Sequence, residues 1–188
     1  MNLDIVLAKE QNQFLDIMPI EFGLKIRPPP LIVEYGEDKR YSALEQDKNG
    51  KFNIRLDSKK VLNSSILDGQ VHELSHYLHF LTNPIMLKYT KITPISLLDS
   101  ELENPVTRLL EFVAELGTLK FRAKQIPNRE RFFQRFVSQH ATECPSKLFL
   151  PAYCAIKNER EDLLSKLAMA PMKEGVDIVD TLIKRYGP

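Results

Sequence analysis

The sequence predicts an α+β fold in which a small mixed or antiparallel sheet is followed mainly by helices. Between residues 30 and 57, apolar residues alternate with polar ones or form β-branched and aromatic runs, which is typical of strands. From residue 64 onward they recur every three or four positions, which is typical of amphipathic helices. A chain of 188 residues, 43% hydrophobic and 27% charged, is ordinary for one globular domain with a buried core.

The N-terminal third is predicted to contain one helix and three strands. Residues 3–17 carry apolar side chains at helical spacing, and we expect this helix to brace the domain. Leu31–Tyr35 is β-branched and aromatic, Tyr41–Leu44 begins a second strand, and Lys51–Asp57 alternates apolar and polar residues. Asp47–Gly50 predicts a hairpin turn, because Asn-Gly tolerates positive φ at both central positions.

The rest of the chain is predicted to be helical. One helix starts at Ser64 or Ser65 and runs to residue 82, where Asn-Pro ends it. Another has Pro105 at its first helical position and runs through residue 124, before Pro127. The pattern assigns no element to residues 85–100. Further helical segments are expected at 128–139, 157–169 and 173–186.

These elements predict a main domain over residues 1–125, with 1–27 as its helical brace, and a helical extension over 126–188 that packs on it. The formal net charge of +1 provides no global field to attract nucleic acid or anionic lipid. Six basic residues do gather between Lys120 and Arg135. Such a run is typically a solvated helix face, so we do not expect a nucleic-acid partner.

No apolar run approaches the roughly 20 residues needed to cross a bilayer. The first residues lack the basic start and cleavage site of a secretory signal, so we expect a cytoplasmic protein without membrane association. Cys144 and Cys154, ten residues apart, resemble neither a disulfide framework nor a zinc knuckle and are expected to be thiols.

The segment His72–His76, with the sequence His-Glu-Leu-Ser-His, points to a metal site. On a helix the two histidines lie about 40° apart and one turn along, so both imidazoles can reach one ion. A chain of this composition would contain the pattern by chance only about 0.007 times. The opposite helix face forms an apolar stripe of Leu67, Val71, Leu74, Leu78 and Leu81. We therefore predict that His72 and His76 bind zinc.

A catalytic zinc ion usually takes three protein ligands and leaves a fourth position to water. Glu111 and Glu115 share the polar face of the helix after Pro105, and a shared cation would relieve their mutual repulsion. Either glutamate can therefore be the third ligand. His79 lies two turns beyond His72, about 10 Å along the axis, which is too far for the same ion. We expect it to line the site or to pair with an acid.

These residues resemble the gluzincin group of zincin metallopeptidases, in which two helix histidines and a glutamate from a following helix hold zinc. His72–His76 matches the active-site motif of that group, and Glu111–Glu115 is similar to the Glu-Phe-x-Ala-Asp element of the prenyl-protein-processing peptidases. By this resemblance, which covers roughly residues 30–125, Glu111 is the third ligand. Glu115 replaces an aspartate that orients a zinc-bound histidine. Since glutamate is one methylene longer, Glu115 stays the alternative third ligand.

The resemblance implies a zincin-like catalytic domain and a zinc-dependent endopeptidase that acts on peptide or protein substrates. Glu73 would be the general base that takes a proton from the zinc-activated water. The strand Phe52–Asp57 would be the edge strand on which such peptidases lay an extended substrate. The transition-state donor stays open among Tyr77, His79, His140 and Tyr153.

The alternative function is a regulatory or binding protein in which zinc is structural or the cleft is permanently filled. Residues 126–188 suggest it, because this extension is larger than a minimal peptidase needs. Such an arrangement resembles that of the small archaeal gluzincins, in which a terminal segment can occupy the cleft. Self-inhibition by the C-terminal segment is therefore a second prediction for the same site.

Overall fold

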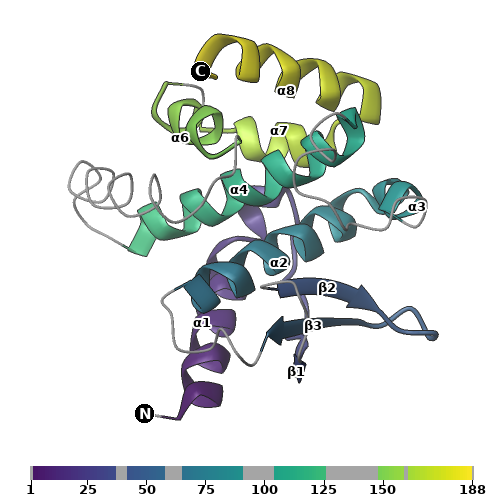
Figure 1. The fold of residues 1–188 in the computed structure, drawn as a ribbon, viewed down its shortest axis with the longest axis vertical. Helices are drawn as coiled ribbons and strands as arrows, with labels where there is room; N and C mark the ends of the chain where they lie inside the picture. The colour runs from purple at the N-terminus through teal and green to yellow at the C-terminus, as the bar shows by residue number, and fades with distance from the viewer. Residues whose placement is uncertain are drawn as a thin grey trace.

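A three-stranded mixed sheet and several helices make up the described part of the chain (Figure 1). The computed structural model describes residues 2–36, 42–57, 65–90, 104–125, 148–158 and 161–187. The strands are β1 (Ile32–Gly36), β2 (Ser42–Gln46) and β3 (Phe52–Asp57). The helices are α1 (Leu3–Ile17), η1 (Ile20–Phe22), α2 (Ser65–Thr82), η3 (Pro84–Met86), α3 (Leu87–Thr90), α4 (Pro105–Gln125), α6 (Phe149–Asn158), α7 (Leu163–Met169) and α8 (Met172–Tyr186). The predicted α+β class is confirmed.

The central strand of the sheet is β3, which pairs in parallel with β1 and antiparallel with β2. The prediction that Phe52–Asp57 is an edge strand is therefore wrong. The hairpin of β2 and β3 joins sequence neighbours, and its turn signal is local. The pairing of β1 with β3 joins strands that are not neighbours in sequence, and no local pattern specifies it.

The turn between β2 and β3 lies where it was predicted but has a different backbone. The N–H of Gly50 donates to the carbonyl of Asp47 at 3.0 Å, and the N–H of Asp47 donates to the carbonyl of Lys51 at 2.8 Å. Within this turn only Gly50 has a positive φ, 80°. The prediction of positive φ at both central positions is wrong, and the turn is a longer loop ending in a left-handed glycine.

One face of β3 packs against α2. Ile54 and Leu56 are fully buried, whereas Arg55, on the opposite face, pairs with Glu45 of β2 at 3.6 Å. At the start of the strand, the rings of Phe52 and Tyr77 meet edge-on with centroids 5.5 Å apart. The alternation of the sequence thus becomes one core face and one polar face.

The helices α2 and α4 lie side by side and antiparallel at the centre of the molecule (Figure 1). Asp68, early in α2, accepts a 2.7 Å hydrogen bond from Arg122, late in α4, while His76 of α2 contacts Glu111 of α4. The predicted apolar stripe of α2 is buried at Val71, Leu74 and Leu78 and partly buried at Leu67. Leu81, 37% exposed, departs from the prediction because it lies in the last turn of the helix.

The helices α6 and α8 pack on the side of α4 opposite α2, whereas α7 contacts η1, α4 and α2 (Figure 1). Arg108 of α4 binds Asp180 of α8 at 2.9 Å, and Asn83 after α2 donates to the carbonyl of Ala170 at 2.9 Å. Leu167 and Val179 belong to the same hydrophobic cluster as the central helices. The described C-terminal helices therefore share the core of the chain.

The predicted helix over 157–169 is confirmed at α7, but residues 157 and 158 belong to the separate helix α6, which begins at Phe149. Pro151 lies in the first turn of α6, where the missing N–H of proline breaks no intrahelical hydrogen bond. The prediction for 173–186 is confirmed by α8. The predicted helix at 128–139 lies outside the described residues. In the segment 85–100, the described part contains the end of η3 and the helix α3.

The described basic residues of the Lys120–Arg135 run are engaged with acids. Lys120 and Lys124 contact Glu21 at 2.6 and 2.7 Å, and Arg122 binds Glu10 and Asp68. The side chain of Arg122 is only 12% exposed, so the expectation of a solvated face is wrong at this residue. The remaining basic residues of the run lie outside the described residues. Within the described ranges, no helix has the length and apolar character needed to cross a membrane.

Candidate metal centre

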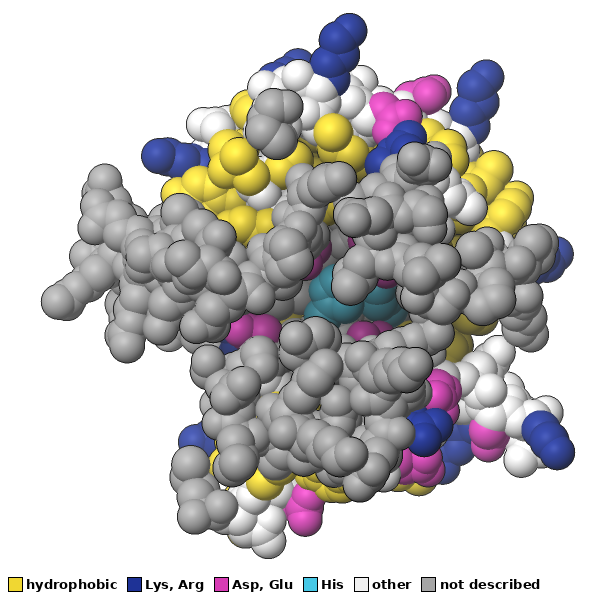
Figure 2. All heavy atoms as spheres, in the orientation of Figure 1, with side chains coloured by type: hydrophobic (Ala, Val, Ile, Leu, Met, Phe, Trp, Pro, Cys, Tyr) yellow, Lys and Arg dark blue, Asp and Glu magenta, His cyan; other side chains and the backbone are white. Residues whose placement is uncertain are grey.

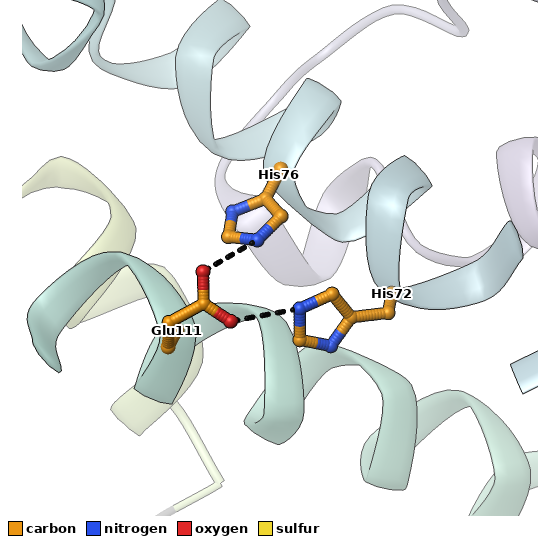
Figure 3. Close-up of side chains that lie close together, drawn as sticks. All are labelled: His72, His76 and Glu111. Atoms are coloured by element: carbon orange, nitrogen blue, oxygen red, sulfur yellow. Dashed lines mark hydrogen bonds and ion pairs between the residues drawn. The ribbon is translucent and has the colours of Figure 1, made fainter. Parts of the chain in front are cut away.

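His72 and His76 lie on the face of α2 that is turned toward α4 (Figure 3). They are one helical turn apart, and their ring centroids are 4.8 Å apart with the rings nearly perpendicular. The rotation of α2 is fixed because Val71, Leu74 and Leu78 are buried in the core. The amphipathic pattern of the helix therefore places both imidazoles toward its neighbour.

The carboxylate of Glu111 bridges the two histidines (Figure 3). Its Oε2 lies 3.1 Å from Nε2 of His72, and its Oε1 lies 3.4 Å from Nε2 of His76. One ligand atom from each of the three residues lies within 4.8 Å of the others. The structure thus brings together two imidazole nitrogens and a carboxylate from two different helices.

The donor set suits zinc. Zinc is bound by nitrogen and oxygen ligands at about 2.0–2.2 Å, so neighbouring ligand atoms around a tetrahedral ion lie roughly 3.3 Å apart. The distances of 3.1 and 3.4 Å join the two different oxygens of Glu111 to the histidines, and one ligand atom from each residue lies within 4.8 Å of the others, so the three side chains would draw closer together around an ion. Three protein ligands would leave a fourth position for water.

Glu115 lies one turn along α4 and reaches the other side of the His72 ring. Its Oε1 is 4.0 Å from Nδ1 of His72, and its side chain is 15% exposed. A carboxylate that accepts a hydrogen bond from the non-coordinating nitrogen of a metal-bound histidine fixes the orientation of the ring, but 4.0 Å is longer than a hydrogen bond. The geometry therefore favours Glu111 over Glu115 as the residue grouped with both histidines.

The charges in this cluster are strongly coupled. Burial alone would lower the pKa of His72, but its hydrogen bond to Glu111 and the nearby charges of Glu111, Glu115 and Glu73 raise that pKa to about 10. Burial alone would raise the pKa of Glu111, but His76 and His72 hold it well below its usual range. Burial, together with the charge of Glu111, raises the pKa of Glu115. The surrounding carboxylates therefore stabilise a positive charge on His72 in the metal-free chain.

Glu73 occupies the neighbouring face of α2, as the sequence predicts for a base that is not itself a ligand. Its side chain is buried, only 7% exposed, and its Oε1 accepts a 2.8 Å hydrogen bond from Oγ of Ser42. Sequence reasoning did not identify Ser42, because a single serine at a strand start has no distinguishing pattern. A local signal did exist in Gly69, a glycine inside a helix and one turn before Glu73, where glycine is unfavourable without a packing reason.

His79 is buried, with 1% of its surface exposed. Within the described residues neither of its ring nitrogens has a hydrogen-bond partner, so the expected pairing with an acid is absent there. Burial and the nearby charge of His76 lower the pKa of His79 to about 3. The imidazole of His79 is therefore neutral at physiological pH.

The other candidates for a transition-state donor are not brought to the cluster by a described contact. The hydroxyl of Tyr77 lies 3.5 Å from the carbonyl of Pro29, and Tyr153 is stacked near Phe149 on α6. His140 lies outside the described residues, as does Cys144. Cys154 is a half-buried free thiol on α6.

The cluster is accessible from one face of the molecule. The side chains of His72 and Glu111 are 20% and 27% exposed. Figure 2 shows histidine side chains visible on this face, with acidic side chains beside them. The side chains of His72 and Glu111 are therefore partly exposed to solvent.

Comparisons with protein-family models, curated proteins and solved structures find no match for this chain. The function must therefore be argued from the geometry of the site itself.

Proposed function

We propose that this chain is a zinc-dependent metallopeptidase of the zincin type, acting as an endopeptidase. The observation that carries the proposal is the carboxylate of Glu111, which contacts Nε2 of both His72 and His76. Two histidines one turn apart and a glutamate from the next long helix would form a three-ligand set that leaves the fourth coordination position to water. The buried carboxylate of Glu73 lies on the adjacent face of the same helix.

When bound, zinc would lower the pKa of a coordinated water toward about 7 and polarise the substrate carbonyl. His72, His76 and Glu111 would hold the ion, and Glu115 would orient the ring of His72. Glu73 would accept a proton from the attacking water. It would then give that proton to the leaving amine nitrogen as the peptide C–N bond breaks.

The outer edge of β2, within the described sheet, would be the binding surface for an extended peptide. Among the described strands β2 is a sheet edge, and Ser42 at its start contacts Glu73. A substrate pairing with β2 through backbone hydrogen bonds would run beside the general base. We therefore assign to β2 the role that the sequence prediction gave to β3.

Glu73→Gln tests the mechanism directly. We expect this variant to bind one zinc ion per chain and to lose peptide cleavage by about 100-fold or more, because the amide cannot take the proton. The measurements are elemental analysis and cleavage of casein and a peptide library by the full chain, with Glu174→Gln on α8 as the control. Full activity in Glu73→Gln would rule out the mechanism.

The same assay tests the alternative function. A full-length chain that binds zinc stoichiometrically but cleaves neither casein nor any library peptide would contradict the peptidase proposal. Such a result would favour a structural zinc ion or a cleft filled by the C-terminal segment.

A further inference from the structure

The hydrogen bond between Ser42 and Glu73 joins the edge of the sheet to the proposed base. Oγ of Ser42 donates to Oε1 of Glu73 at 2.8 Å, across 31 positions of sequence. Among the described residues, Ser42 is the hydrogen-bond donor to this carboxylate. A buried carboxylate with one oxygen held in this way has little freedom to rotate.

The backbone around this contact is arranged to bring the two side chains together. Gly69 lies one turn before Glu73 on α2, and a Cβ at residue 69 would lie only 3.2 Å from Oγ of Ser42. The absence of a side chain at Gly69 therefore leaves the space that Ser42 occupies. Such a Cβ contact is tight, so alanine at residue 69 would require the Ser42 side chain to shift by a few tenths of an ångström.

The sheet fixes the other end of the contact. Ser42 is the first residue of β2 and pairs in register with Leu56 of the central strand, which is fully buried. Its side chain points to α2, whereas the backbone groups of the free edge lie in the plane of the sheet. Replacing the hydroxyl therefore leaves the edge of β2 intact.

We propose that Ser42 is a positioning residue, which holds Oε1 of Glu73 and so leaves Oε2 as the oxygen that takes the proton. This inference rests on the proposed function. Because β2 is also the proposed substrate-binding edge, the contact couples the strand that binds the peptide to the orientation of the base. Ser42 touches neither the substrate nor the reacting atoms in this role.

Kinetics of the full chain with zinc bound test the role of the hydroxyl. We expect Ser42→Ala to lower kcat about tenfold or more while KM changes less than about twofold, because a misaligned base slows proton transfer without altering the binding edge. Ser42→Thr, which keeps the hydroxyl, should restore most of kcat, and Gly69→Ala should lower kcat. Ser165→Ala on α7 is the matched control, and all variants should keep one zinc ion per chain.

A double-mutant cycle on the metal-free chain provides a measurement that needs no activity. Ser42→Ala should lower the denaturant midpoint of the wild type but have a smaller effect in a Glu73→Ala background, because the interaction is already lost there. Additive shifts would overturn the coupling itself. An unchanged kcat in Ser42→Ala, with an active wild type, would overturn the positioning role alone. If the wild type cleaves no peptide but the Ser42 and Glu73 substitutions are not additive, the proposed function is overturned and Ser42 has only a structural role.

Discussion

At the residue scale, the three acids around the histidines reach different atoms. Glu111 faces Nε2 of both rings, Glu115 lies near Nδ1 of His72, and Glu73 is turned toward Ser42. The sequence placed Glu111 and Glu115 on one helix face but could not separate them, since they differ by one turn only. The side-chain geometry separates their positions, because only Glu111 lies close to both histidines.

Removal of each acid of α4 should affect zinc differently. We expect Glu111→Ala to lose stoichiometric zinc, because a ligand is removed. Glu115→Ala should bind zinc about 10–100-fold more weakly, and its site should still be occupied when zinc is in excess. Elemental analysis after dialysis and competition with a chromophoric chelator measure both. The matched control is Glu174→Ala on α8. Stoichiometric zinc in both variants would refute the third-ligand assignment. Loss of zinc from Glu115→Ala alone would show that Glu115, not Glu111, is the third ligand.

Protons and zinc compete for His72. Coordination needs a neutral imidazole, and the pKa of His72 in the metal-free chain is raised to about 10. As pH increases toward that value, the apparent zinc affinity should therefore rise about tenfold per pH unit, because each bound ion displaces the proton of His72. Chelator competition at several pH values between about 6.5 and 8 measures the slope. An affinity that does not change with pH would contradict the prediction.

The same protonation also affects the stability of the metal-free fold. Because the folded-state pKa of His72 is raised from 6.5, its stabilising contribution is fully present below about pH 6.5 and is lost as pH rises toward 10. Glu111, whose pKa is lowered, contributes in the opposite sense, and its stabilisation is lost as pH falls below its usual range. The cluster therefore stabilises the metal-free chain between these limits.

At the element scale, the site depends on how closely α2 and α4 approach. Gly117 of α4 lies against Ser75 of α2, and a Cβ at residue 117 would come within 2.7 Å of Oγ of Ser75 and 2.9 Å of the Phe22 ring. The boundaries of both helices were predictable, because 3.6-residue periodicity and flanking prolines are local signals. Their contact was not, since it joins residues far apart in sequence.

Gly117→Ala should therefore disturb both packing and metal binding. We expect a loss of about 1–3 kcal/mol in the free energy of unfolding, because the added methyl group overpacks the helix contact. Denaturant unfolding and zinc titration measure the two effects. Gly69→Ala, whose nearest contact is a less severe 3.2 Å, is the graded comparison and should destabilise less. A Gly117→Ala variant as stable as the wild type would contradict the close approach.

At the scale of the whole molecule, one hydrophobic cluster joins the described N-terminal and C-terminal helices. The helix α4 is its centre, since it contacts α2 on one side and α6 and α8 on the other. The proposed metal ligands on α2 and α4 therefore lie at the junction between the sheet layer and the C-terminal helices. A zinc ion shared by these two helices should stabilise the entire fold.

Zinc removal should accordingly lower the melting temperature. With free zinc at about 100 times Kd, binding stabilises the folded state by about 2.7 kcal/mol, which corresponds to roughly 5–10 °C for a chain of this size. Thermal unfolding with added zinc and with a chelator measures the shift. A His72→Ala, His76→Ala double variant is the control and should show little difference between the two conditions. Equal melting temperatures in the wild type would contradict a shared ion.

The sequence by itself determined the α+β class, the bounds of α2 and α4, and the chemical character of His72, Glu73 and His76. These features follow from periodicity, prolines and side-chain type, which act within a few residues. The tertiary structure alone decided that β3 is central, that Glu111 faces both histidines, and that Ser42 holds Glu73. Each of these depends on a contact between elements distant in the chain, and such contacts are set by the packing of the whole core rather than by local pattern.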